Sequence, residues 1–261
     1  MYESVKIPEK SRRSGKKKKP EPLIEIHDLH KSFGKNKVLD GFDMELFEKE
    51  NVVMLGRSGS GKSVLLRCIL RLEEIDSGML NVLGENIPDL NDEELNRIRT
   101  EVGLLFQGSA LYDSMTVREN LEFPLRRHPE KSNGEDEEEL IQNTLESVGL
   151  ADKIDAMPGE LSGGQKRRIA LARTLVLKPK IILYDEPTTG LDPITSKEII
   201  ELILNLQEQY GSTSFIITHD MDCARVISNR MIVLLDGVNY AEGTYQELAK
   251  SNDSKVRAFF K

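Results

Sequence analysis

The sequence predicts an α/β fold with a largely parallel central sheet and a helical subdomain inserted into it. Six short apolar runs have the length and residue types of buried strands, and helical patterns lie between several of them. Strands and helices that alternate in this way form parallel sheets with helices on both faces. The six predicted strands are Leu23–Ile26, Val52–Leu55, Val102–Phe106, Ile181–Tyr184, Phe215–Thr218 and Met231–Leu235.

Helical patterns follow three of these runs, at Ser63–Leu72, Gln165–Leu177 and Ile194–Tyr210. Residues of roughly Gly108–Lys178 are rich in helical patterns and lack a strong strand pattern, so they interrupt the α/β alternation. We therefore expect an inserted helical subdomain at about 108–178. Its acidic stretch Glu130–Glu139 indicates an exposed loop that enters a helix over Glu137–Val148.

The first 22 residues differ from the rest of the chain in composition. They hold eight Lys or Arg residues and three Glu residues, and they show no hydrophobic periodicity. This composition predicts a disordered basic tail over residues 1–22, either simply solvated or attracted to anionic lipid. Residues 23–250 are predicted to form the ordered domain, and residues 251–261 a C-terminal tail.

Length, charge and hydropathy narrow the class of protein. A chain of 261 residues suits one large domain, or a domain with a subdomain, and can bury a substantial core. The net charge of −8, with a basic tail on a more acidic body, argues against nucleic acid as a partner. No apolar run approaches the ~20 residues that span a bilayer, and no secretory signal is recognisable, so we expect a cytoplasmic chain. Cys68 and Cys223 lack a metal-ligand spacing and are expected to be small buried residues.

A glycine-rich segment after the second predicted strand matches the phosphate-loop pattern G-x-x-x-x-G-K-[ST]. Glycines let the backbone curl so that successive N–H groups point at a phosphate, and the following helix adds the positive end of its dipole. The lysine neutralises β- and γ-phosphate oxygens, and the serine hydroxyl ligates Mg²⁺. The predicted nucleotide-binding residues here are Gly56, Arg57, Ser58, Gly59, Ser60, Gly61, Lys62, Ser63 and Val64, with Ser63 also a metal ligand.

Two carboxylates end the apolar strand Ile181–Tyr184. A buried strand delivers the first, Asp185, to the Mg²⁺ side of the phosphate loop, where it is a predicted metal ligand. The second, Glu186, reaches the γ-phosphate side and can orient and polarise the attacking water there. General-base assistance of this kind contributes about 10²–10⁴-fold to a rate.

The segment Leu161–Gln165, with the sequence LSGGQ, predicts a second phosphate cradle at the start of a helix. Ser162 offers a hydroxyl, and Gly163 and Gly164 offer approachable backbone N–H groups. We expect this cradle to face outward, away from the nucleotide of its own chain, so that two copies placed head to tail could each close the other's ATP site. We interpret the cationic run Lys166–Arg168 that follows as a solvated helix face.

The order of these motifs resembles that of the ATP-binding cassette (ABC) ATPases, in which LSGGQ is the family signature. The resemblance runs from about Ile24 to the C-terminus. It implies a P-loop NTPase (RecA-like) core with an antiparallel β edge, ATP and Mg²⁺ as cofactors, and a homodimer that hydrolyses ATP. It makes Glu186 the catalytic glutamate and adds Gln165 to the nucleotide-binding residues.

The resemblance also assigns roles to four residues outside these motifs. Gln107 links the core to the helical subdomain and contacts Mg²⁺ or the lytic water. His219 is the switch histidine that contacts the γ-phosphate, so Glu186, His219 and Gln107 are the predicted catalytic residues. Asp192 contacts the phosphate loop of the other chain. Phe33 stacks on adenine, an interaction worth ~1–3 kcal/mol by analogy with nucleobase platforms.

The sequence after Gln107 resembles the ATPases of Mla-type phospholipid transporters. Gly108–Leu125 carries most of this likeness, and Asp192–Thr195 and Val256–Phe260 add to it. The likeness implies phospholipid transport between bacterial membranes, a separate multi-span permease, an MCE-type lipid-binding protein, and a peripheral position at the cytoplasmic face of the inner membrane. Arg57 stands where that family often has Pro, with its side chain expected to point away from the cradle.

Other functions remain open from the sequence alone. The chain could serve an ABC transporter with a different cargo, or act as a soluble ABC ATPase of the iron–sulfur assembly type. DNA-type members carry long coiled coils and ribosome-type members usually carry two cassettes in one chain. The sequence has neither feature, so we expect no nucleic-acid partner. A P-loop kinase would leave LSGGQ unexplained.

Overall fold

The computed structural model describes residues 20–132 and 134–260, so most of the predicted basic tail, residues 1–19, lies outside the described part. Its largest sheet has six strands in the order β10-β9-β3-β8-β7-β6. Neighbouring strands from β9 to β6 are parallel, and β10 pairs with β9 in the antiparallel sense. The strands are β3 (Asn51–Leu55), β6 (Val102–Leu105), β7 (Ile181–Asp185), β8 (Thr213–Ile217), β9 (Arg230–Leu235) and β10 (Val238–Gly243).

The predicted α/β class is confirmed, since every apolar run that the sequence offers after residue 50 is a strand of this sheet. These strands are continuous apolar runs because both faces of the sheet are covered. In β3 and β8 every residue is buried.

A second sheet is wholly antiparallel and has the strand order β2-β1-β4-β5. Its strands are β1 (Ile24–Phe33), β2 (Asn36–Leu46), β4 (Ser77–Val82) and β5 (Glu85–Asn86). The sequence analysis predicts only the beginning of β1. The remaining strands mix buried and exposed positions, so they contain no apolar run of the kind that marks the central sheet.

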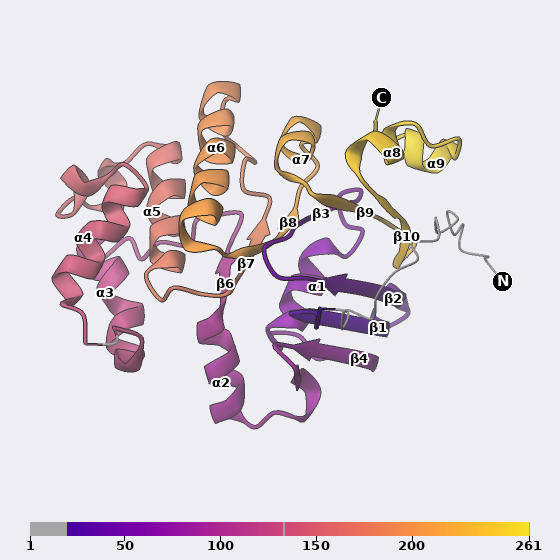
Figure 1. Ribbon diagram of the computed structural model, residues 1–261, viewed down its shortest axis with the longest axis horizontal. Helices are drawn as coiled ribbons and strands as arrows, with labels where there is room; N and C mark the ends of the chain where they lie inside the picture. The colour runs from indigo at the N-terminus through magenta and orange to yellow at the C-terminus, as the bar shows by residue number, and fades with distance from the viewer. Residues whose placement is uncertain (1–19, 133, 261) are drawn as a thin grey trace.

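Helices connect the strands and cover both faces of the central sheet (Figure 1). α1 (Lys62–Ile69) and α2 (Asp92–Glu101) lie on the side of the antiparallel sheet, and α6 (Pro193–Tyr210) and α7 (Met221–Ile227) lie on the other side. Between β6 and β7 the chain forms α3 (Val117–Arg127), α4 (Glu137–Ser147) and α5 (Gly163–Leu175), which pack against one another on the left of Figure 1. The remaining short elements are α8 (Tyr245–Ala249), α9 (Ser254–Arg257) and 3₁₀ turns at Ile87–Asp89, Pro129–Ser132, Ala151–Lys153 and Pro158–Glu160.

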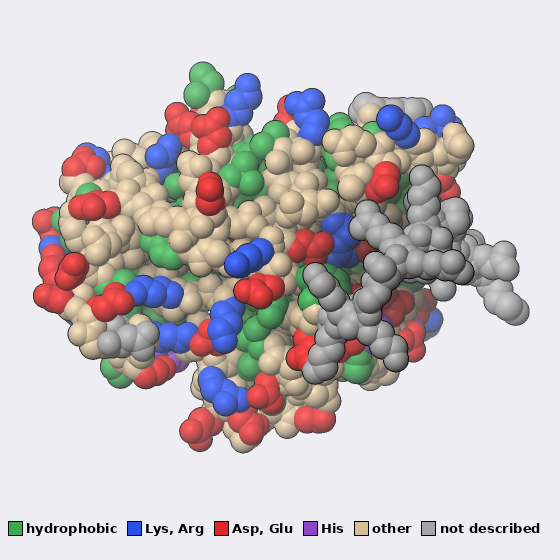
Figure 2. Space-filling view, in the orientation of Figure 1, with side chains coloured by type: hydrophobic (Ala, Val, Ile, Leu, Met, Phe, Trp, Pro, Cys, Tyr) green, Lys and Arg blue, Asp and Glu red, His purple; other side chains and the backbone are tan. Residues whose placement is uncertain are grey.

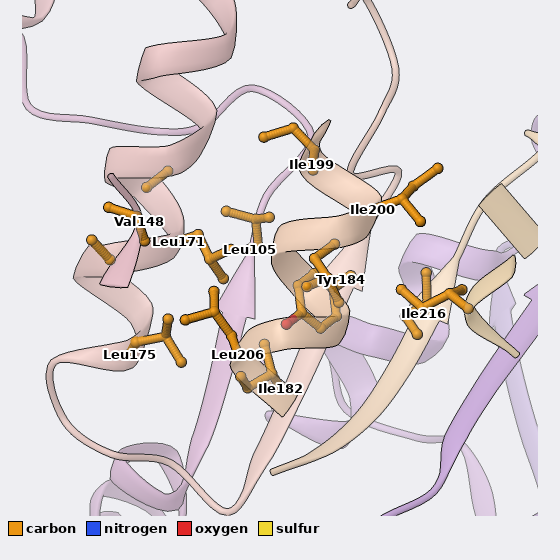
Figure 3. Close-up of a cluster of buried hydrophobic side chains, with 14 of the residues drawn as sticks. Leu105, Val148, Leu171, Leu175, Ile182, Tyr184, Ile199, Ile200, Leu206 and Ile216 are labelled. Carbon is orange, nitrogen blue, oxygen red and sulfur yellow. The ribbon is translucent and has the colours of Figure 1, made fainter. Parts of the chain in front are cut away.

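The central sheet separates two hydrophobic cores, because successive residues of a strand face opposite sides. Val53 and Leu55 face the core that α5, α6 and α7 cover. Val52 and Met54 face the core shared with α1 and the antiparallel sheet. Figure 3 shows side chains of the first core: Leu105, Ile182, Tyr184 and Ile216 from strands, Leu171 and Leu175 from α5, and Ile199, Ile200 and Leu206 from α6.

The segment predicted as a C-terminal tail packs against the domain. Val256 of α9 is buried, and the rings of Tyr245 and Phe260 meet edge-on with 5.4 Å between their centroids. Across residues 20–132 and 134–260, no helix combines the length and hydrophobicity that crossing a membrane requires. On the face shown in Figure 2, acidic and basic side chains are interspersed rather than gathered by sign.

Candidate functional site

The glycine-rich loop lies between the end of β3 and the start of α1, where its motif places it. Gly61 precedes the first helical residue and has a φ of 100°, a conformation that favours glycine. A Cβ atom on Gly61 would lie 2.4 Å from Val38 Cγ1, so a larger residue does not fit. Lys62 begins α1, is 7% exposed, and donates from its ammonium to the carbonyl oxygens of Gly56 (2.9 Å) and Arg57 (3.1 Å). The loop is therefore wrapped around its own lysine.

The loop and β7 bring two oxygen groups together at the start of α1. Ser63 Oγ donates a hydrogen bond of 3.0 Å to Asp185 Oδ1. Mg²⁺ prefers oxygen ligands and usually takes one or two from the protein and the others from water and substrate phosphates. Ser60 Oγ, in the same loop, is buried without a hydrogen-bond partner in the described part of the chain. These groups fit an Mg²⁺–nucleotide complex in chemistry and in number.

Electrostatics point to the same ligand. Burial raises the pKa of Asp185, and the negative charge of Glu186 adds to that effect, whereas the hydrogen bond from Ser63 and the charge of Lys62 oppose it. Burial lowers the pKa of Lys62, and the two carboxylates counteract that change. A cation beside the carboxylates and an anion beside the lysine would each favour the charged form of the buried group.

Glu186 follows β7 with a φ of 53°, a left-handed conformation that residues with a Cβ atom seldom adopt. Its N–H donates to the carbonyl oxygen of Ile217 at 2.9 Å. Its Oε2 atom accepts from Thr189 Oγ1 at 3.1 Å and lies 2.7 Å from His219 Nδ1, while its Oε1 atom is 3.9 Å from Lys62 Nζ. Such strain costs ~1–3 kcal/mol and persists where surrounding contacts hold the residue. The buried carboxylate is thus fixed between the lysine and the histidine.

LSGGQ forms a capping box at the start of α5. Ser162 Oγ accepts from the N–H of Gln165 at 3.2 Å, and Gln165 Oε1 accepts from the N–H of Ser162 at 2.9 Å. The helix therefore begins at Gly163 rather than at Gln165. Ser162 and Gly163 are exposed, whereas a Cβ atom on Gly164 would lie only 2.6 Å from Thr195 Cγ2 of α6. Gly164 is required because α5 and α6 approach closely there.

Three further predicted residues lie apart from this carboxylate cluster. Asp192 caps α6 by accepting hydrogen bonds from two N–H groups of the first turn, and these bonds help to lower its pKa, with the Thr195 hydroxyl as the largest cause. Phe33 is 46% exposed at the end of β1. Gln107 is exposed two residues after the end of β6, and among the described residues no hydrogen bond joins its side chain to Asp185 or Glu186.

Arg167 is a buried residue that the sequence analysis places wrongly. The prediction of a solvated face over Lys166–Arg168 fails at Arg167, which is 4% exposed. Its guanidinium donates to carbonyl oxygens of the loop after β6. Arg167 lies three residues before Ala170 and four before Leu171, both buried, so it shares their helix face. That spacing is the signal that could have identified it.

A family model described as ABC transporter matches residues 39–189. This range contains the phosphate loop, LSGGQ and the strand that ends in Asp185 and Glu186. The chain belongs to the ABC transporter family. The cassette fold predicted from the order of motifs is confirmed, and so is an ATPase that uses ATP with Mg²⁺. As an ABC transporter ATPase, the chain acts peripherally at the cytoplasmic face of a membrane.

Its relatives include two ATP-binding proteins whose names refer to glutamine transport and methionine import. The chain is 42% identical over 235 residues to the glutamine transport ATP-binding protein GlnQ of Escherichia coli (strain K12), covering 89% of this chain and 96% of that protein. It is 40% identical over 215 residues to the methionine import ATP-binding protein MetN of Clostridium tetani, covering 82% and 67% respectively. A dimeric ATP-binding cassette in a post-hydrolysis state with ADP and Pi superimposes with a TM-score of 0.76 at 34% identity, covering 85% of this chain and 98% of that chain.

Proposed function

We propose that two copies of this ABC ATPase work head to tail as the motor of a membrane transporter. One observation carries the proposal. The chain builds two phosphate cradles on different elements, Gly56–Ser63 and Ser162–Gly164, with no hydrogen bond between them in the described part of the chain. Ser162 and Gly163 of the second cradle are exposed and available to a phosphate held by another copy. The dimeric cassette with ADP and Pi supports this arrangement.

The binding roles follow from where the side chains lie. Phe33 stacks on the adenine, and Gly56–Val64 hold the phosphates. Ser63, Asp185 and Gln107 hold Mg²⁺, which when bound neutralises negative charge on the phosphate oxygens. Because Gln107 is exposed on the loop after β6, this role requires its side chain to move toward the other two when nucleotide binds.

The catalytic roles belong to the strained end of β7. Glu186 orients and polarises the attacking water, and its burial beside Lys62 keeps the carboxylate directed into the site. His219, 2.7 Å from that carboxylate, holds it in place and contacts the γ-phosphate with its exposed ring edge. Gln165 fixes the start of the signature helix, and Asp192 fixes the start of α6 facing the partner copy.

A groove of 560 Å³ next to the Gln107 loop is the proposed contact with a multi-span permease. Three of its lining side chains, Leu72, Phe106 and Tyr112, are 50%, 41% and 43% exposed, which is unusual for large apolar residues so close together. The segment Gly108–Leu125 contributes Ala110, Tyr112, Phe123 and Pro124 to its lining. A short cytoplasmic segment of a membrane protein would cover these side chains.

Two cargoes are candidates. The names of the relatives, glutamine transport and methionine import, favour a small amino-acid-like cargo. The likeness of Gly108–Leu125 to Mla-type ATPases favours phospholipid as the second candidate, with an MCE-type protein as an additional partner. We favour the first, because it rests on alignments that cover most of the chain.

Affinity purification of the tagged chain from gently solubilised membranes tests both the transporter role and the cargo. We expect a multi-span protein to co-purify, and the ATPase rate of the complex to rise with the amino acid rather than with phospholipid vesicles. Stimulation by phospholipid, together with an MCE-type protein in the complex, would reverse the order of the cargoes. Recovery of the chain only in the soluble fraction, without a membrane partner, would favour the iron–sulfur assembly type of ABC ATPase instead.

A further inference from the structure

The loop that carries Gln107 has an unusual backbone. Ser109 and Ala110 both have positive φ, at 62° and 51°, although neither is glycine. Two consecutive left-handed residues persist only where other groups hold them. Hydrogen bonds within the loop are few: the N–H of Ser109 donates to the carbonyl oxygen of Phe106 at 3.1 Å, and that of Ala110 donates to Gly108 at 2.7 Å. The holding groups come from elsewhere in the chain.

Two arginines of the signature helix α5 supply them. Arg167 donates to the carbonyl oxygens of Phe106 at 2.7 Å and Gln107 at 2.5 Å. Arg173, less than two turns further along α5, donates to the carbonyl oxygens of Ala110 at 2.8 Å and Ser109 at 3.3 Å. Four of the five carbonyl groups between residues 106 and 110 are therefore bound to one helix.

Arg167 also reaches the catalytic segment. Its guanidinium donates to the carbonyl oxygen of Thr189 at 3.4 Å, and the hydroxyl of Thr189 donates to Glu186 Oε2 at 3.1 Å. A single planar group thus contacts the Gln107 loop and the segment after Glu186. It does so from a position two residues after Gln165, within the rigid first turns of α5. The fork of an arginine suits this task because its several N–H donors have a fixed geometry.

The surroundings of Arg167 are those of a positioning group rather than of an ion pair. Burial lowers the pKa of Arg167, and no carboxylate in the described part of the chain offsets that effect. Its Nε atom is buried without a hydrogen-bond partner among the described residues. A buried cation with one unpaired donor is a costly way to fill space, so its hydrogen bonds to two separate segments are the property that accounts for it.

We propose that Arg167 is a positioning residue that fixes the Gln107 loop and the Glu186 segment relative to the signature. The inference rests on the proposed head-to-tail dimer. When Ser162–Gly164 closes on the nucleotide of the other copy, α5 moves as well. Because Arg167 joins the Gln107 loop to α5, the same movement brings that loop into position. Closure of the other copy's nucleotide site and the placement of Gln107 and Glu186 at the chain's own site then occur together.

The test compares Arg167→Met with Arg167→Lys and with a matched control on the same helix, Arg168→Met. Arg168 pairs with Glu198 of α6 at 2.7 Å, so its loss removes a cation from α5 without touching the Gln107 loop. For Arg167→Met we expect kcat for ATP hydrolysis to fall at least about tenfold, because small misplacements of reacting groups have large effects on rate. The affinity of the phosphate loop for nucleotide should stay within about twofold. Arg167→Lys, which keeps one donor direction, should recover part of the rate, and Arg168→Met should stay within about twofold of the wild type.

Hydrogen exchange provides a readout that a purely structural role would not give. In Arg167→Met, the amides of residues 106–110 should exchange faster while those of β3 and β8 keep their protection. The inference fails if kcat of Arg167→Met stays within about twofold of the wild type. It also fails if nucleotide affinity and the exchange protection of the whole domain are lost together with kcat. ATP-dependent dimerisation in the Glu186→Gln background separates the proposed dimer from the proposed role of Arg167. If that variant stays monomeric with ATP, the proposed dimer fails. If Glu186→Gln and Glu186→Gln/Arg167→Met dimerise equally well and kcat is unaffected by Arg167→Met, only the role of Arg167 fails.

Discussion

Contacts from Thr189, His219 and Lys62 converge on Glu186. Its left-handed backbone turns the side chain away from the line of β7 and toward Lys62 and His219. Three donors surround the carboxylate, namely the Thr189 hydroxyl and the N–H and Nδ1 of His219. A carboxylate held in this way stays oriented, which is what a group that polarises water requires.

Replacing Glu186 by Gln keeps the shape of the side chain and removes its negative charge. We expect nucleotide binding to persist and kcat to fall by about 10²–10⁴-fold, the usual contribution of a general base. ATP should then accumulate in a closed dimer, measurable by light scattering after size exclusion. Lys62→Met should differ by losing nucleotide affinity as well, and near-normal turnover in Glu186→Gln would exclude the proposed role.

At the scale of elements, Arg230 joins the two sheets. From β9 it donates to both carboxylate oxygens of Glu50, at 2.7 and 2.8 Å, to the carbonyl oxygen of Glu45 in β2, and to the carboxylate of Glu242 in β10. Burial alone would lower the pKa of Arg230, but the hydrogen bonds and charges of Glu50 and Glu242 outweigh it and raise the pKa. The antiparallel sheet is therefore tied to the edge of the central sheet through one guanidinium.

Loss of Arg230 should destabilise the fold strongly. Arg230→Met leaves the carboxylate of Glu50 largely buried and unpaired, so we expect the free energy of unfolding to fall by about 3–5 kcal/mol. The matched control is Arg225→Met, because Arg225 pairs with Asp222 on the surface of α7. That exposed pair is worth about 0–1 kcal/mol. Urea denaturation of both variants measures the difference, and equal losses would refute the special role of Arg230.

The whole molecule keeps both of its cysteines inside, one in each core. Cys68 lies in the core next to the antiparallel sheet and Cys223 in the core under α6, as the sequence analysis expects of small buried residues. Burial raises the pKa of the Cys68 thiol to about 11 and that of the Cys223 thiol to about 12, from an ordinary value of 9.0. The fold therefore favours the neutral thiol at both positions.

This preference predicts a pH dependence. A raised folded-state pKa gives stability that is complete below the unfolded value and is lost as pH rises toward the folded value. The free energy of unfolding should fall between pH 9 and about 11 by up to ~1.4 kcal/mol per pH unit for each thiol. Denaturation curves of the wild type and of Cys68→Ala/Cys223→Ala at several pH values measure it. If the two proteins lose stability in parallel, the thiols do not contribute.

How far the sequence predicts this molecule depends on the kind of signal. Five strands of the central sheet are recognisable as apolar runs because both faces are covered, and the motifs of Lys62 and Glu186 lie at the ends of two of them. The edge strand β10 is not recognisable in this way, because its residues are only partly buried. The strand β2 is not predicted, because polar residues at several positions obscure its alternating pattern. The burial of Arg167 is not predicted, because a charged residue between two other charged residues is typical of a solvent-exposed helix face. Contacts between distant segments, such as those of Arg167, depend on how the helices pack against the sheet, so no local sequence pattern predicts them.

The close approach of Gly164 to Thr195 makes these two positions a pair for genetic suppression. Gly164→Ala should lower ATP turnover because the added methyl group collides with Thr195 Cγ2, 2.6 Å away. Thr195→Ser deletes that atom and keeps the hydroxyl that donates to Asp192 at 2.5 Å. The double variant should therefore recover turnover that Gly164→Ala alone has lost, and a revertant screen of Gly164→Ala should return Ser at position 195. If it does not, the signature glycine is demanded by the partner's nucleotide rather than by the chain's own helix.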